Sequence, residues 1–171
     1  MSMEHKAFIF DYEAFELELK EILETALDLN DTEGLEKFIK LNINYLIDPY
    51  EGEQLSEDWN EMLEYRDPHE YGDFALTKFY NATDDIGLNY EWIEIGDMLS
   101  SESGESISIF GNSIGKDGNY FDPGKMGSYF QSSRMVKENN DRINILIKSK
   151  LVYRELLTPV SCMFDAATLS N

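Results

Sequence analysis

Apolar residues recur at intervals of three and four over residues 12–47, and this spacing constrains the fold more than any other feature. Residues three and four apart share one face of an α-helix, so the pattern predicts amphipathic helices over about 12–29 and 32–47. Thr32 is a residue type that caps helices, and Asp48-Pro49 is expected to end the second helix. The short connection predicts an antiparallel pair. The residues expected on its buried face are Phe15, Leu19, Ile22, Leu23, Phe38 and Ile39.

The next part of the chain is expected to be helical only in places. Residues 56–65 predict a short helix capped by Ser56, because its first turn is acidic as the helix dipole favours. Segment 67–79 fits either a helix or a strand. Residues 81–106 resemble a loop, with a helical turn near Trp92. The residues expected on the inner face of the short helix are Trp59, Met62 and Leu63.

The pattern changes after residue 105. Alternation predicts a strand over 106–114, glycines predict turns over 111–130, and helical spacing predicts a helix over about 133–150. Residues 151–164 fit a strand or a short helix. We therefore expect an α+β fold: N-terminal antiparallel helices packed with a small, mainly antiparallel sheet and a C-terminal helix. At 171 residues a single domain, 1–171, is expected, with an acidic helical part at about 1–100 and a second part at about 106–165.

The net charge of −20 is concentrated in the first part of the chain. Residues 1–105 carry 28 acidic and six basic residues, whereas residues 106–171 carry six acidic and eight basic residues. Stretches 41–65 and 79–115 contain no Lys or Arg. Such a field repels nucleic acid and anionic membrane and attracts a basic protein. Two interpretations stay open: the acids serve solubility alone, or they form a binding face.

The sequence also predicts a cytoplasmic protein without a membrane span. The first residues contain no apolar core of a secretory signal, and no apolar run approaches the roughly 20 residues that a spanning helix needs. The single cysteine, Cys162, cannot form an internal disulfide and lies among apolar neighbours, so we expect an inert thiol.

No complete catalytic, metal-binding or cofactor-binding motif is present, so we expect no cofactor and no metal. The run from Gly111 to Asp117 is one residue too short for a phosphate-binding loop and has a carboxylate in place of its Ser/Thr. The acidic turns at Asp84 and Asp117 lack the ligand series of a calcium loop. Carboxylate pairs are too numerous to single out an acid/base pair, which leaves an unlocated one as an alternative.

Two aromatic-rich segments are the candidate binding elements. Loop 119–130 has four rings around turn residues; either these rings pin the loop to the core or some act as anchors. We expect Phe121 and Phe130 to point inward, and Tyr120 or Tyr129 to lie at the surface near Lys125, because a phenol tolerates water better than a phenyl ring. Segment 84–92 mixes acids and rings similarly. The candidate binding residues are Glu57, Asp58, Asp84, Asp85, Trp92, Tyr120, Lys125 and Tyr129.

In size, acidity and lack of motifs the chain resembles stand-alone bacterial immunity proteins that neutralise toxin domains. The resemblance is one of composition and transfers no residue. It implies a non-enzymatic protein whose acidic face binds a basic, nuclease-like toxin domain, with no direct contact to nucleic acid or membrane. The alternatives are a small hydrolase or transferase and a structural subunit of a larger complex. The sequence does not predict the oligomeric state.

Overall fold

The computed structural model describes residues 4–102, 110–124 and 128–149. These residues form six α-helices and two small two-stranded sheets, which is the expected α+β class. The chain divides into two compact units, and the single-domain organisation stays a prediction. The helical unit comprises Asp11–Thr83 and Asn112–Phe130. The terminal unit comprises Met1–Phe10, Asp84–Gly111 and Gln131–Asn171.

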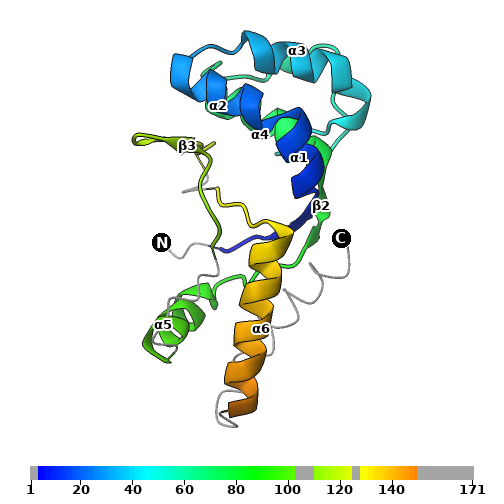
Figure 1. Cartoon of the computed structure of the whole chain (residues 1–171). Helices are drawn as coiled ribbons and strands as arrows, with labels where there is room; N and C mark the ends of the chain where they lie inside the picture. Colours follow the sequence, from blue (N-terminus) through cyan, green and yellow to red (C-terminus); the bar gives the residue numbers. More distant parts are fainter. Residues whose placement is uncertain (1–3, 103–109, 125–127, 150–171) are drawn as a thin grey trace. The chain divides into compact units, whose positions relative to one another are not determined.

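Helices α1 to α4 form the body of the helical unit (Figure 1). The helix expected over 12–29 is present as α1 (Tyr12–Glu18) and α2 (Lys20–Leu29). The next helix is α3 (Glu33–Asn42), followed by a 3₁₀ turn, η1 (Ile43–Tyr45). The ambiguous segment after residue 67 is helical, as α4 (Pro68–Leu76) and η3 (Thr77–Phe79). Thus α2 and α3 make the expected antiparallel pair, and both pack on α4.

The boundary between α1 and α2 is a bend at Leu19. Its amide donates to the Phe15 carbonyl at 3.0 Å, and its own carbonyl accepts from the Leu23 amide at 2.9 Å, so helical hydrogen bonding continues through it. Thr32 occupies the N-cap position of α3 without a side-chain bond. The Asp31 carboxylate accepts from the Glu33 amide at 3.0 Å instead. Asp31 therefore supplies the side-chain oxygen expected from Thr32.

The core of the helical unit confirms five of the six residues expected on the buried face. Phe15, Leu19, Leu23, Phe38 and Ile39 are buried. Ile22 was predicted incorrectly, because it is only half-buried. Its outer side faces Gly34 of α3, which has no side chain to cover it; a Cβ at Gly34 would lie 3.1 Å from Ile22 Cγ2.

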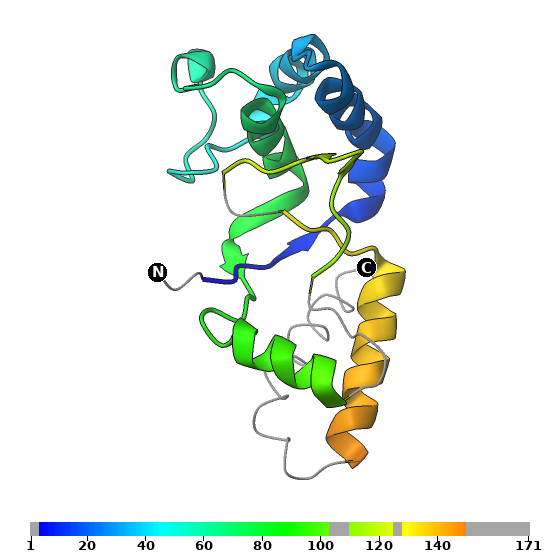
Figure 2. The ribbon, with the colours of Figure 1, turned by 90° about the vertical axis from the view of Figure 1, so that its left-hand side faces the viewer.

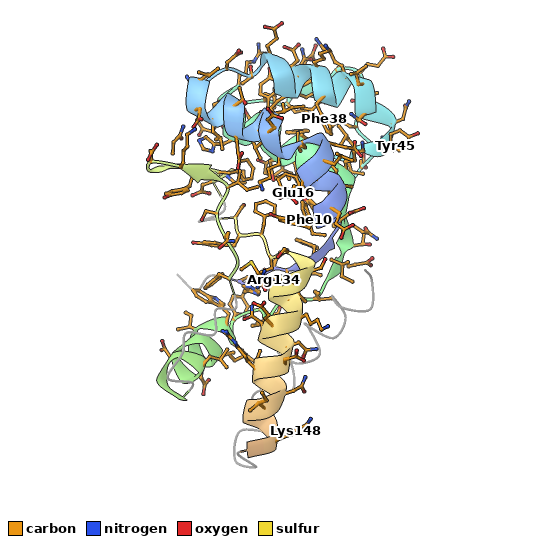
Figure 3. All side chains as sticks on the ribbon, in the orientation of Figure 1. Phe10, Glu16, Phe38, Tyr45, Arg134 and Lys148 are labelled. Carbon is orange, nitrogen blue, oxygen red and sulfur yellow. The ribbon has the colours of Figure 1, made fainter. Side chains whose placement is uncertain are left out.

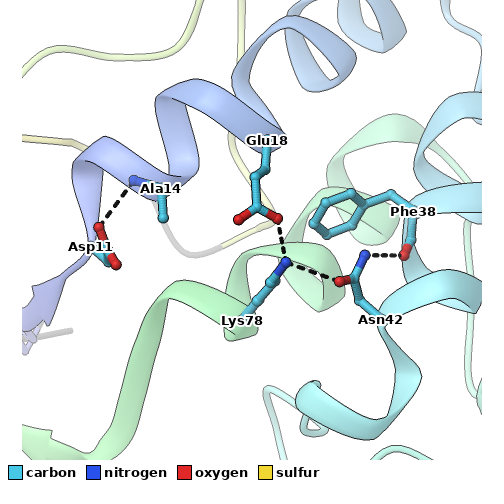
Figure 4. Close-up of polar contacts among 6 residues, drawn as sticks. All are labelled: Asp11, Ala14, Glu18, Phe38, Asn42 and Lys78. Atoms are coloured by element: carbon cyan, nitrogen blue, oxygen red, sulfur yellow. Dashed lines mark hydrogen bonds and ion pairs between the residues drawn. The ribbon is translucent and has the colours of Figure 1, made fainter.

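Lys78 ties α1, α3 and η3 together, as Figure 4 shows. Its ammonium pairs with Glu18 and donates to Asn42 Oδ1 at 2.9 Å. The same nitrogen lies 5.4 Å from the Phe38 ring centre and 5.7 Å from that of Phe79. A cation over two rings and beside a carboxylate is stabilised by both, because the ring faces are electronegative.

The glycine-rich region forms a hairpin beside α2, made of β3 (Gly115–Lys116) and β4 (Asn119–Tyr120). Gly115 has a φ of +108°, and a Cβ there would lie 2.1 Å from the Asn119 carbonyl oxygen, so only glycine fits. After the hairpin, Phe121 packs against α4, where Gly72 makes room: a Cβ at Gly72 would lie 2.6 Å from the Phe121 ring. The prediction of turns over this run is confirmed.

The terminal unit contains β1 (Phe8–Phe10), α5 (Trp92–Glu102) and α6 (Ser133–Ser149). Strand β1 pairs with β2 (Tyr80–Asp85), through which the division between the units passes. The loop expected over 81–106 was therefore wrong: its described residues include most of β2, and the helical turn expected near Trp92 is the beginning of the longer helix α5. In α5, Ile95 and Leu99 are buried at the four-residue spacing of one helix face. The helix expected over 133–150 is confirmed as α6.

Two further expectations need correction or lie outside the described residues. Residues 110–114 of the strand expected over 106–114 form no strand; they contribute one isolated bridge, between Asn112 and Phe130. Residues 106–109, Lys125, segment 151–164 and Cys162 lie outside the described residues. Within the described ranges, every helix is too short or too polar to cross a bilayer.

His5 joins the beginning of the chain to the segment before α5. Its Nδ1 accepts from the Leu88 amide at 3.1 Å, its backbone pairs with Asn89, and its ring meets the edge of Phe110 at 5.8 Å. Burial lowers the pKa of His5, although the charge of Asp85 raises it in part. The neutral ring is therefore the form that this contact requires.

We predict that the terminal unit loses stability as the pH falls below about 6.5, the pKa of an unperturbed histidine. The unfolded chain gains its His5 proton there, whereas the folded chain gains it only at lower pH. Urea unfolding followed by NMR of the Leu88 amide at pH 7.5 and pH 5 measures this loss. His5→Gln should be less sensitive to pH, and an equal loss in both proteins would contradict the assignment.

Candidate binding surface

The connecting segment, residues 43–67, joins α3 to α4 and carries the densest acidic stretch of the helical unit. Its residues 43–65 include seven acids and no Lys or Arg. Figure 2 shows it in cyan and teal at the periphery of the helices. The short helix expected over 56–65 shrinks to one 3₁₀ turn, η2 (Trp59–Glu61). Met62 follows this turn and is 48% exposed, so its expected inward position was wrong.

Four apolar side chains anchor the connecting segment. Trp59 is 2% exposed and meets Tyr71 edge-on, with ring centres 5.5 Å apart, and Phe74 at 6.0 Å. The other buried anchors are Leu46, Leu55 and Leu63. Since these anchors are spread along the segment, its backbone is held against α4 although it has little regular secondary structure.

Polar bonds fix the backbone between these anchors. The carboxylate of the buried Asp48 accepts from the Tyr50 amide at 2.7 Å and the Glu51 amide at 3.2 Å. The Gln54 amide group donates to the Ile43 carbonyl at 2.9 Å and the Leu46 carbonyl at 2.8 Å. The first half of the connecting segment is therefore a hydrogen-bonded turn rather than a free loop.

Glu70 fixes the other end of the segment. One of its carboxylate oxygens accepts from the Glu64 amide at 2.6 Å; the second accepts from the Tyr65 amide at 2.9 Å and the Arg66 amide at 2.7 Å. Asp67 caps α4 by accepting from the Glu70 amide at 2.9 Å, which orients the residue. Charge-assisted bonds to three consecutive amides hold this backbone in one conformation.

Large side chains lie exposed on this fixed backbone. Tyr45 is 72% exposed, Tyr50 62%, Tyr65 73%, and Met62 also faces solvent. Figure 3 shows Tyr45 at the outer edge of the unit and Phe38 between the helices. Sequence reasoning did not select these tyrosines, although the signal was present: aromatic residues in an acidic stretch without a cation.

Neighbouring carboxylates raise the pKa of two of these phenols, those of Tyr50 and Tyr65. The charge and hydrogen bond of Glu64, with the charge of Glu70, raise the pKa of Tyr65. Burial raises the pKa of Tyr50, as do the charges of Asp73 and Glu70. The charge of Glu70, in the first turn of α4, contributes to the shift of both pKa values.

Two of the sequence-predicted binding residues, Glu57 and Asp58, belong to the connecting segment and are exposed. The Asp58 carboxylate accepts from the Ser56 hydroxyl, and this bond lowers its pKa. Ser56 thus bonds within its own turn instead of capping the expected helix.

The loop after the hairpin has the expected orientation. Phe121 is 1% exposed, and Phe130 stacks on Phe15 with ring centres 5.5 Å apart. Tyr120 and Tyr129 are each about half exposed. The backbone is held where the Asp122 amide donates to His69 Nδ1 at 3.1 Å. Phe121 and Phe130 thus hold the loop to the rest of the unit, whereas the role of Tyr120 and Tyr129 as anchors near Lys125 stays a prediction.

The remaining sequence-predicted residues lie in the terminal unit. Asp84 is exposed, and Asp85 accepts from the Ala7 amide at 3.1 Å and the Gly87 amide at 2.8 Å. Trp92 is half-buried and meets the edge of Phe110 at 5.5 Å. Asp85 and Trp92 thus have structural contacts of their own, and their binding role stays a prediction.

The cations of the helical unit are largely paired within it. The unit has 22 acidic and seven basic residues. Ion pairs join four of the basic residues to its own acids: Lys20–Glu16, Lys40–Glu36, Lys78–Glu18 and Lys116–Asp28. None of these cations belongs to the connecting segment. Its carboxylates therefore present a negative field to solvent.

Two features of the described residues bear on the alternative of an enzyme. An open depression of about 280 Å³ between α2 and α3 is lined by Glu21 and Asp31 together with neutral side chains. Within the same residues, no three or more His, Cys, Asp or Glu side chains are grouped to hold a metal ion.

Comparisons of this chain with protein-family models, curated proteins and solved structures found no match. The fold and the surface define an acidic α+β protein whose connecting segment carries exposed tyrosines on a hydrogen-bonded backbone.

Proposed function

We propose that this chain is a non-enzymatic protein-binding protein of the immunity or inhibitor type, and that its acidic helical unit docks a basic protein such as a nuclease-like toxin domain. One observation carries the proposal: six carboxylates of the connecting segment, on residues 51–64, are exposed, and the only cation of the segment is Arg66 near its end. Exposed acids on a rigid base accelerate encounter with a positively charged surface. Nucleic acid, which has the same sign of charge, is repelled.

The test is the association rate with a partner captured from the native host at low salt and identified as a single purified protein. That partner should have a positive net charge. Its association rate should fall roughly tenfold to a hundredfold between low and high ionic strength, because screening shortens the reach of the field. A rate that ignores salt, or an acidic partner, would contradict the proposal.

Charge reversal locates the responsible acids. We predict that Glu57→Lys with Asp58→Lys slows association roughly tenfold at low salt, since both side chains are exposed on the connecting segment. The control is Glu138→Lys with Asp141→Lys on α6, in the terminal unit, which reverses two exposed acids and so changes the net charge by the same amount. Equal slowing by both reversals would show that only total charge matters and that the connecting segment has no special role.

A further inference from the structure

We propose that the connecting segment recognises arginine and lysine side chains through its exposed rings, with the tyrosine surface (Tyr45, Tyr50, Met62 and Tyr65) as the docking site of a basic protein. This inference rests on the proposed function and adds the chemistry of recognition. The acids account for attraction at long range, and the rings account for the bound contact.

These side chains are far more exposed than the other aromatic residues of the same region. The same region buries Trp59, Tyr71 and Phe74, so aromatic residues that serve the core are already packed. Tyr45, Tyr50 and Tyr65 instead expose well over half of their surface. Single exposed apolar residues are ordinary, but a gathering on one segment is typical of an interaction surface.

The rings are presented by a backbone that is already ordered. Tyr50 follows the Asp48 turn, and its ring also meets Phe74 at 6.4 Å. The Tyr65 amide is held by Glu70. A tyrosine has few rotatable bonds, so fixing it on binding costs little conformational entropy. Preorganised tyrosines of this kind are suited to act as anchors.

Charge complementarity selects the occupant. The Glu70 carboxylate holds the Tyr65 amide, and its charge raises the pKa of both the Tyr50 and the Tyr65 phenol; the Glu64 side chain is hydrogen-bonded to Tyr65. A cationic side chain over either ring would meet the electronegative ring face and a carboxylate at once. An anionic or purely apolar partner would meet only repulsion or uncompensated desolvation of those carboxylates.

The protein uses the same combination internally. Lys78 lies over the rings of Phe38 and Phe79 while it pairs with Glu18. The tyrosine surface has exposed rings and the exposed Glu64 carboxylate; its segment has one cation, Arg66, for which the described residues give no ring contact like that of Lys78. A partner's arginine or lysine would supply the missing cation.

The experiment measures the binding of a short labelled peptide of alternating arginine and glycine to the full chain at low salt, by fluorescence anisotropy. Its counterpart with citrulline, which keeps the shape of arginine without the charge, is the ligand control. The variant Tyr50→Leu with Tyr65→Leu removes the rings but keeps apolar bulk, and should weaken binding roughly fivefold to tenfold. Tyr50→Phe with Tyr65→Phe keeps both rings and should stay within about twofold.

A matched tyrosine outside the surface is Tyr90, which is 60% exposed in the terminal unit; Tyr90→Leu should leave binding unchanged. If the double leucine variant does not fold, the single change Tyr65→Leu at the most exposed ring decides. If the leucine variants still bind the arginine peptide, and this binding still weakens with salt, the inference about the rings is overturned. The proposed function, which depends on the acids, is then left intact. Failure of the unmodified chain to bind the arginine peptide better than the citrulline peptide overturns both.

Discussion

Trp59→Ala should lower the free energy of unfolding by about 3–5 kcal/mol, because it removes a fully buried indole and leaves a cavity between the connecting segment and α4. The substitution also removes the edge contact of the indole with Tyr71 and its contact with Phe74. A loss of this size is a large fraction of the stability of an ordinary domain. Urea unfolding followed by circular dichroism measures it.

Two control variants test whether the loss of stability comes from the burial of the Trp59 side chain. Met62→Ala, three residues along the same segment at a side chain that is about half exposed, should change stability by less than about 1 kcal/mol. Trp59→Phe should cost less than Trp59→Ala, because part of the ring volume remains. If Trp59→Ala and Met62→Ala left the urea midpoint equally unchanged, the connecting segment would not be anchored as described, and its preorganisation would have to be abandoned.

The second large effect concerns the aromatic centre of the helical unit. Phe15→Ala should also cost about 3–5 kcal/mol, because the ring is completely buried. It stacks on Phe130 with an interplanar angle of 8° and meets the edge of Phe79 at 5.8 Å. One substitution thus weakens contacts among α1, η3 and the loop that follows the hairpin.

The matched control for Phe15→Ala is Leu17→Ala on the same helix. Leu17 is 86% exposed, so its truncation should alter stability by less than about 0.5 kcal/mol. A second readout is the NMR signal of the Phe130 ring, which should shift in Phe15→Ala and stay in place in Leu17→Ala. Equal unfolding midpoints for the two variants would show that the stacked rings do not stabilise the unit.

These two predictions bear on binding through the same physical link. An exposed tyrosine is a useful anchor only if its backbone is already fixed, and Trp59 supplies that fixation for the connecting segment. We therefore expect Trp59→Ala to weaken a partner's binding even under conditions where most of the chain stays folded. Phe15 contacts the rings of Phe79 and Phe130, which do not belong to the tyrosine surface. Phe15→Ala should therefore change stability more than affinity.

Local periodicity determined much of the helical unit. The spacing of Phe15, Leu19 and Leu23, and of Phe38 and Ile39, indicates which side of each helix is buried, because residues three and four apart share a face in any α-helix. The same reasoning located α6 and the turns of the glycine-rich run. It failed at Ile22, because burial there depends on Gly34 of the neighbouring helix.

Tertiary contacts decided the rest. Strand β2 gains its partner, β1, from a segment some 70 residues earlier, and no local pattern announces such a pairing. The same holds for the rings: Tyr50, Tyr65 and Tyr71 all stand among acids in the sequence, yet only Tyr71 is buried, against Trp59. Composition alone determined that the chain carries an acidic field. Packing on α4 decided which aromatic side chains stay exposed within that field, because the exposure of a side chain depends on the neighbours that the fold brings to it.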